Sequence, residues 1–142
     1  MKERSAKNAE MKSLADYSIA DFFMCKCQKP LVNEAWHEYE SIVRDLDEQL
    51  KQLPPLYEQD GKGFQATVYA HYFGGATDIF VTECSGEDAF GYVILNGDYE
   101  SSELGYISIK ELTEIELLNL DFFWEPCALH EALSEVDSEY FQ

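Results

Sequence analysis

The hydrophobic pattern changes its period at Leu53-Pro54-Pro55, and this change limits the folds open to the chain. Before this point, apolar side chains recur every three or four residues, which is the spacing of an amphipathic helix. After it, apolar and polar side chains alternate, as they do in strands. We therefore predict an α+β fold, with a helical N-terminal arm at residues 1–52 and an acidic α+β domain at residues 53–142.

The arm contains two predicted helices. The first covers about residues 8–24 and must end before Pro30, because proline lacks an amide hydrogen and restricts the residue before it. The second covers residues 34–52, with Asn33 expected as its N-terminal cap. Its apolar stripe consists of Trp36, Tyr39, Ile42, Val43, Leu46 and Leu50. Such a stripe needs a partner surface, so residues 1–52 are expected to pack on the rest of the chain or to form a homodimer, and both remain open.

After the prolines, the sequence predicts a four-stranded antiparallel meander followed by C-terminal helices. Four segments rich in β-branched and aromatic residues, at 64–73, 78–84, 89–95 and 104–109, are separated by glycine-containing turns. Ser108 is placed to cap a short helix. The apolar residues expected to cover the sheet from there are Ile109, Leu112, Ile115, Leu117 and Leu118. A last helix is predicted at 128–136.

Several short motifs, in the same order and spacing, resemble those of a known protein family. They are Leu53-Pro-Pro-Leu-Tyr57, Val68-Tyr-Ala-His-Tyr-Phe73, Phe80-Val-Thr-Glu83, Phe90-Gly-Tyr-Val93, Glu103-Leu-Gly-Tyr106, Ser108-Ile-Lys-Glu-Leu112 and the aromatic segment Asp121–Pro126. Through them, residues 53–133 resemble the domain of unknown function 2958 family, small proteins of bacterial plasmids, conjugative elements and phages. The family often has a longer, tryptophan-bearing stretch where this chain has Gly74-Gly75. The resemblance implies a mobile-element context and assigns no catalytic residue.

The chain is strongly acidic, and the charge is unevenly distributed. Ten Lys and Arg oppose 28 Asp and Glu, for a net charge of −18. Residues 1–30 carry six basic and four acidic residues, whereas residues 31–142 carry four basic and 24 acidic residues. Direct binding to nucleic acid or to anionic membranes is therefore not expected, because both require Lys and Arg. The partner that this charge favours is a basic host protein, itself nucleic-acid-binding; a solvated acidic surface without a partner is the simpler alternative.

The candidate partner-binding residues are acids on predicted turns and on the last helix, where exposure is expected. They are Glu83, Glu87, Asp88, Asp98, Glu100, Glu103, Glu131 and Glu135. Carboxylates placed where phosphates would lie could occupy a cationic nucleic-acid channel. Together with the mobile-element context, this predicts an anti-defence accessory protein, a DNA-mimic-like inhibitor of a nucleic-acid-binding defence system.

Two other functions are weighed against this one. A small-ligand or peptide-binding module would use an aromatic pocket of Tyr106, Phe123 and Trp124; the plainer interpretation buries these rings in the core, with Gly105 allowing close strand packing. A metal-dependent nuclease would use the acids between Glu83 and Asp88, but no His or Lys is spaced to complete such a site. We expect no enzyme activity, no catalytic residues, no cofactor and no metal site.

The cellular compartment is expected to be the cytoplasm. The charged N-terminal residues are not followed by an apolar run typical of a signal peptide, and no segment has the length of a membrane span. The four cysteines are then expected to be reduced thiols. Cys25-Lys-Cys27 is too closely spaced for the usual zinc-binding pair.

Overall fold

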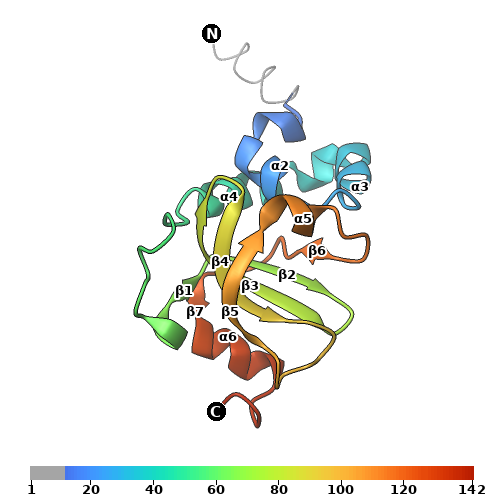
Figure 1. Cartoon of the computed structure of the whole chain (residues 1–142). Helices are drawn as coiled ribbons and strands as arrows, with labels where there is room; N and C mark the ends of the chain where they lie inside the picture. The colour runs from blue at the N-terminus through green and yellow to red at the C-terminus, as the bar shows by residue number, and fades with distance from the viewer. Residues whose placement is uncertain (1–11) are drawn as a thin grey trace.

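The computed structural model describes residues 12–142 and has an α+β fold (Figure 1). An antiparallel sheet occupies the middle of the molecule, with the N-terminal helices at one end and the C-terminal helix α6 (Leu129–Val136) near the other. The first predicted helix, at residues 8–24, lies partly outside the described residues. Within them it is replaced by η1 (Leu14–Asp16) and α2 (Ser18–Phe23).

Proline has a different role in the arm from the one the sequence suggested. Pro30 lies in the first turn of α3 (Lys29–Glu34), where the missing amide hydrogen would have no partner in any case. The first helical segment does end before Pro30, as predicted, because α2 ends at Phe23, but the sequence did not predict the helix α3 that contains Pro30. Asn33 lies inside α3 and does not cap the next helix, α4 (Trp36–Leu50), which begins after Ala35. The apolar stripe of α4 does face inward, with Val43, Leu46 and Leu50 buried.

The central sheet has five strands, in the order β5-β4-β3-β2-β6. The strands are β2 (Ala70–Gly74), β3 (Thr77–Ser85), β4 (Asp88–Ile94), β5 (Glu103–Ser108) and β6 (Asn119–Leu120). Strand β6 pairs with Tyr72 and Phe73, and the sequence offered no sign of it because two residues carry no periodic pattern. The segment predicted as one strand at 64–73 is divided among η2 (Gly63–Gln65), β1 (Thr67–Val68) and β2. Strand β1 pairs instead with β7 (Cys127–Ala128) in a separate two-stranded sheet.

The predicted cap of the short helix after β5 is confirmed, but the helix is shorter than expected. The hydroxyl oxygen of Ser108 accepts a hydrogen bond of 3.2 Å from the Glu111 amide, at the start of α5 (Ile109–Thr113). Because α5 ends at Thr113, Ile115 and Leu117 do not cover the sheet and are 49% and 83% exposed.

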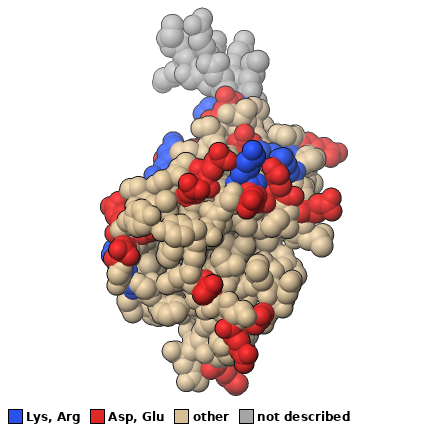
Figure 2. All heavy atoms as spheres, viewed as in Figure 1, with Lys and Arg blue, Asp and Glu red and all other residues tan. Residues whose placement is uncertain are grey.

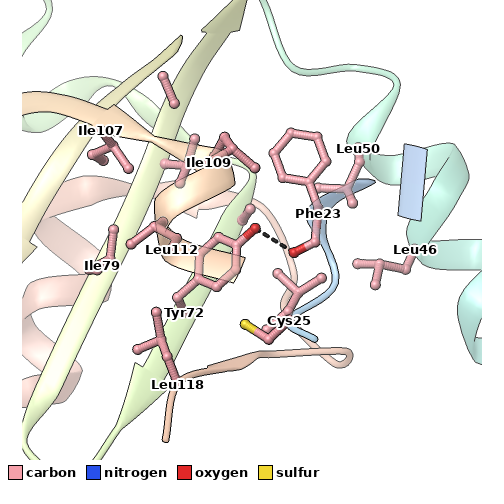
Figure 3. Packing of buried hydrophobic residues seen from close by; sticks show 14 residues of the cluster. Phe23, Cys25, Leu46, Leu50, Tyr72, Ile79, Ile107, Ile109, Leu112 and Leu118 are labelled. Atoms are coloured by element: carbon pink, nitrogen blue, oxygen red, sulfur yellow. Dashed lines mark hydrogen bonds between the residues drawn. The ribbon is translucent and has the colours of Figure 1, made fainter. Parts of the chain in front are cut away.

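Two apolar clusters lie on opposite faces of the sheet. Ile79 and Phe80 are adjacent in β3 but belong to different clusters, because successive side chains of a strand point to opposite faces. The first cluster joins the sheet to the N-terminal segment through Phe23 and to α4 through Leu50 (Figure 3). The second joins the sheet to α6. The arm was expected to pack on the rest of the chain or to form a homodimer. In the structure it packs on the sheet, and a homodimer stays a prediction.

Tyr72 connects the arm to the sheet directly. Its side chain is fully buried, and its hydroxyl donates a hydrogen bond of 2.6 Å to the Phe23 carbonyl oxygen (Figure 3). Burial raises the pKa of Tyr72 well above its usual value, so the hydroxyl keeps its proton.

We expect Tyr72→Phe to lower the free energy of unfolding by about 1–2 kcal/mol, because it removes this donor and leaves a buried carbonyl oxygen unpaired. Urea denaturation of the two proteins measures the difference. Tyr140→Phe, at a half-exposed position, is the control and should change the free energy of unfolding by less than about 0.5 kcal/mol. Equal stability of Tyr72→Phe and the parent chain would contradict this role.

Candidate functional site

Of the eight candidate acids, Glu83 is not on the surface. Its side chain is 4% exposed, and its carboxylate accepts hydrogen bonds from the backbone amides of Tyr57 (3.0 Å) and Gln59 (2.6 Å). The sequence placed Glu83 at the end of a strand beside a turn, but β3 continues to Ser85. A β-bulge between Val81 and Glu83 turns the Glu83 side chain toward the loop that precedes β1. Its assignment as a partner-binding acid is therefore corrected: Glu83 anchors that loop.

The other seven candidate acids are exposed, and they form separate groups. Glu87 and Asp88 lie at the turn between β3 and β4. Asp98, Glu100 and Glu103 lie at the opposite end of β4 and β5. The seven residues of β4 separate these two groups by about 20 Å. The remaining two, Glu131 and Glu135, lie on α6.

Basic side chains are concentrated in the helical part of the molecule. The ion pairs there include Lys26–Glu114 (3.4 Å), Lys29–Asp21 (3.0 Å), Arg44–Glu40 (3.7 Å) and Lys51–Glu48 (3.0 Å). Residues 63–142 contain 16 acids and a single basic residue, Lys110. Figure 2 shows the same division on one face: Lys and Arg appear among acids in the upper part, whereas only acids appear at the lower end. The carboxylates of the sheet region therefore have few cations to neutralise them.

The three candidate aromatic residues are not brought together. Tyr106 is 65% exposed on β5, and Phe123 is 75% exposed beside a different hollow that includes Tyr39. Trp124 is half-buried, and its indole nitrogen donates a hydrogen bond of 3.0 Å to the Val68 carbonyl oxygen. The expected pocket of Tyr106, Phe123 and Trp124 is therefore not formed, and Tyr106 does not fill the core.

Tyr106 instead lines a pocket of about 300 Å³ that the sequence did not predict. The pocket lies between β3, β4, β5 and the loop of residues 57–66, and its lining includes Tyr57, Phe90, Tyr106, Asp60 and Glu83. The Tyr106 hydroxyl donates a hydrogen bond of 3.1 Å to the Tyr57 hydroxyl. This hydrogen bond raises the pKa of Tyr106, and the negative charges of Asp60 and Glu83 raise it further.

The loop that closes this pocket is held by buried polar contacts. The Gln59 side chain donates to the Thr67 and Thr82 carbonyl oxygens, at 3.0 and 2.8 Å, and accepts from the Thr67 amide at 2.7 Å. Gly61 and Gly63 both have positive φ, which suits glycine. Gly61-Lys62-Gly63 lacks the spacing of a phosphate-binding loop. It shapes a turn beside the pocket.

A second hollow, of about 460 Å³, has a mainly apolar lining. It lies beside β5, an edge strand of the sheet, and its walls include Ile79, Val93, Leu95 and Ile107. The exposed side chains of Leu95 and Leu117 contribute to it. This hollow offers apolar contact area and few groups for specific recognition.

His71 lies between two carboxylates in a further polar cluster. Its Nε2 is 2.7 Å from an Asp78 oxygen, and its Nδ1 is 3.3 Å from an Asp121 oxygen. The ring stacks on Phe80, with centroids 4.7 Å apart. Both ring nitrogens therefore have partners, and His71 has none free for proton transfer or for a metal ion. We interpret the cluster as a structural link between β2, β3 and the segment after β6.

The cysteines show no sign of a reactive site. All four thiols are free, and Cys25 is buried. Burial raises the pKa of Cys25 to about 12 and that of Cys84 to about 11, so both stay protonated near neutral pH. Cys84 donates to the Gly86 carbonyl oxygen, whereas His71 is occupied by its two aspartates. A Cys84–His71 nucleophile pair is therefore not formed.

Within residues 12–142, no group of three or more His, Cys, Asp or Glu side chains is arranged to hold a metal ion. No helix in this part of the chain has the length and apolar character needed to cross a membrane. Comparison with protein-family models, with curated proteins and with solved structures finds no match to the chain.

Proposed function

We propose that this chain binds a basic surface of a partner protein through the carboxylates of its sheet region. The observation that carries the proposal is the charge of residues 63–142, where 16 acids face a single basic residue. Seven of the eight candidate acids are exposed. Such an excess of carboxylates over cations creates a negative potential that attracts a cationic surface and accelerates association with it.

The more specific form of the proposal is an accessory protein of a mobile element that inhibits a nucleic-acid-binding defence system in the cytoplasm. The family resemblance of residues 53–133 supports the mobile-element context. The two acidic groups at the ends of β4 are about 20 Å apart, a length of duplex axis that carries about 12 phosphates. A cationic nucleic-acid channel in a host protein is long enough to contact both groups. This makes mimicry of DNA the favoured mode of inhibition.

The proposal predicts that binding depends on where the acids are and not only on the net charge. The test variant removes four exposed acids near the lower end of the sheet and on α6: Asp98→Asn, Glu100→Gln, Glu131→Gln and Glu135→Gln. The control variant removes four exposed acids from the helical arm: Glu34→Gln, Glu38→Gln, Asp45→Asn and Glu48→Gln. Both variants lose the same charge.

We expect the test variant to bind the partner at least about tenfold more weakly, and the control variant to bind like the parent. The partner is first captured from host lysate at low salt, identified by mass spectrometry and then titrated with each variant. Binding should weaken steeply as salt rises, because exposed charges are screened. Capture of no nucleic-acid-binding protein at low salt, or equal losses for the two variants, would contradict DNA mimicry.

The nuclease alternative receives little support from the geometry. The Glu83 carboxylate is already used by two backbone amides, and Glu87 and Asp88 remain on an exposed turn. Incubation of the purified protein with plasmid DNA and Mg²⁺ or Mn²⁺ tests this alternative. We expect no cleavage; cleavage that is lost in Asp88→Ala would show a nuclease and overturn the proposal that the chain is not an enzyme.

A small-ligand or peptide-binding module remains the second candidate function, and the observation that favours it is the pocket at Tyr106. Binding of an uncharged ligand in this pocket would change little with salt, whereas binding between charged surfaces would weaken. The salt titration above therefore also separates these two functions.

A further inference from the structure

We propose that the pocket at Tyr106 receives a single arginine side chain of the basic partner, an inference that rests on the proposed function. A volume of about 300 Å³ is at the lower end for ligand pockets, so it suits one side chain better than a larger ligand. The pocket is open at the surface, where Tyr57 and Tyr106 are both exposed. An inserted side chain would make it the anchor of a wider contact between charged surfaces.

The aromatic wall suits a guanidinium group. Phe90 and Tyr106 meet nearly edge to face, with ring centroids 5.2 Å apart and planes at 71°. The Tyr57 ring adjoins Tyr106, because its hydroxyl accepts a hydrogen bond from the Tyr106 hydroxyl. A planar, delocalised guanidinium stacks on aromatic rings, and cation–π attraction strengthens the contact.

The charge of the lining also selects a cation. Asp60 and Glu83 line the pocket, and among residues 12–142 no Lys or Arg side chain does. The Asp60 carboxylate is exposed and makes no hydrogen bond or ion pair with residues 12–142. Glu83 is held below the surface by its two amide hydrogen bonds, so its charge acts on the pocket from a fixed position. Arginine fits better than lysine because its five donors can reach several acceptors while its plane stacks on a ring.

The position of the pocket agrees with a role in the same interface as the surface acids. Phe90 and Tyr106 are paired across β4 and β5, two residue pairs along the ladder from the pair Asp88 and Ser108. Asp88 and Phe90 are two residues apart in β4, so their side chains leave the same face of the sheet. Glu103 adjoins Leu104 in β5, but neighbouring side chains of a strand point to opposite faces, so Glu103 does not share the face of the pocket. A partner that contacts Asp88 on the pocket's face therefore lies beside the pocket.

The loop side of the pocket is already in place without a ligand. Tyr57 has a φ of 77°, which is unfavourable for a residue other than glycine. Its amide bonds to Glu83 and its ring hydroxyl to Tyr106, and these contacts hold the residue in this conformation. A preformed wall loses less conformational entropy when a side chain enters.

The test uses short blocked peptides as probes and the full chain as the receptor. Acetyl-Gly-Arg-Gly-amide is titrated into the labelled protein, and the amide signals are followed by NMR. The same peptide with citrulline, which is neutral but similar in shape, tests the need for charge, and the peptide with lysine tests the need for a planar cation. We expect saturable shifts of Tyr57, Phe90 and Tyr106 with the arginine peptide, and at least about fivefold weaker binding of the other two.

Two matched variants separate the pocket from the general surface charge. Tyr106→Ala removes the wall and should weaken the arginine peptide at least about fivefold, whereas Phe123→Ala removes an equally exposed ring elsewhere and should not. Asp60→Asn, which keeps the shape of the pocket, should weaken binding as well. An unchanged pattern of amide signals away from the pocket shows that each variant is folded.

The inference is overturned if citrulline or lysine peptides bind as well as the arginine peptide, or if Tyr106→Ala binds it like the parent. Its failure can be told apart from failure of the proposed function. If the four-acid variant loses the captured partner but Tyr106→Ala does not, only the arginine pocket is wrong. If Tyr106→Ala weakens the peptide while the four-acid variant still binds the partner, the charged-surface proposal is wrong and the pocket stands.

Discussion

Glu83→Gln is expected to lower the free energy of unfolding by about 3 kcal/mol, a large part of the total of about 5–15 kcal/mol typical of a domain. In the parent chain each carboxylate oxygen accepts a hydrogen bond from one backbone amide, of Tyr57 or of Gln59. Glutamine keeps the size of the side chain but offers only one acceptor oxygen. The side-chain NH2 group of glutamine would face a backbone N–H, so two hydrogen-bond donors would be buried against each other.

Urea denaturation measures this loss, and hydrogen exchange locates it. The amides of Tyr57 and Gln59 should exchange much faster in Glu83→Gln than in the parent, while amides in α4 should change little. Glu87→Gln removes an exposed charge four residues away and serves as the control, with an expected effect below about 0.5 kcal/mol. If Glu83→Gln were as stable as this control, Glu83 would not be the anchor of the loop.

Gly91→Ala is expected to destabilise the protein by at least about 4 kcal/mol, or to prevent folding. A Cβ atom at Gly91 would lie 1.8 Å from the Phe80 carbonyl oxygen and 2.8 Å from its carbonyl carbon. Both are backbone atoms of the neighbouring strand, which cannot move aside as a flexible side chain can. The β-bulge in β3 begins at Val81, the residue that pairs with Gly91, and brings the two backbones together.

Gly105 provides a matched control, because it pairs with Gly91 on the neighbouring strand. A Cβ atom at Gly105 would meet no other atom within 4 Å. Gly105→Ala should therefore change the free energy of unfolding by less than about 0.5 kcal/mol, or raise it slightly by restricting the unfolded chain. Thermal and urea denaturation of both variants test the contrast. Similar stability of Gly91→Ala and Gly105→Ala would mean that β3 can shift to make room.

The glycines of β4 and β5 and the acid Glu83 show that local sequence patterns can assign the wrong role to an individual residue. The sequence suggested that Gly105 allows close strand packing, but the structure assigns that role to Gly91. It placed Glu83 among the exposed acids, but the side chain is buried. A β-bulge in β3 lies between Val81, which pairs with Gly91, and Glu83, and no feature of a single sequence marks its position.

Features that depend on neighbours along the chain could be predicted from the sequence. Helical spacing placed α4 and α6, the alternating segments after Pro55 placed β3, β4 and β5 to within about a residue, and Ser108 was confirmed as a helix cap. The net charge of −18 and its concentration after residue 30 follow from composition alone. Helical spacing, strand alternation and helix capping depend on residues a few positions apart, so they can be recognised in the sequence.

The tertiary structure alone decided which distant residues meet. It placed the arm on the sheet through Tyr72 and Phe23, which are 49 residues apart in the chain. It also built the pocket from a loop near Tyr57 and a strand near Tyr106, again 49 residues apart. Neither pair has a sequence signal, because the contacts arise only after strands have paired and loops have closed over them. The charge that favours a basic partner can be seen in the sequence, whereas the proposed arginine pocket could be found only in the folded chain.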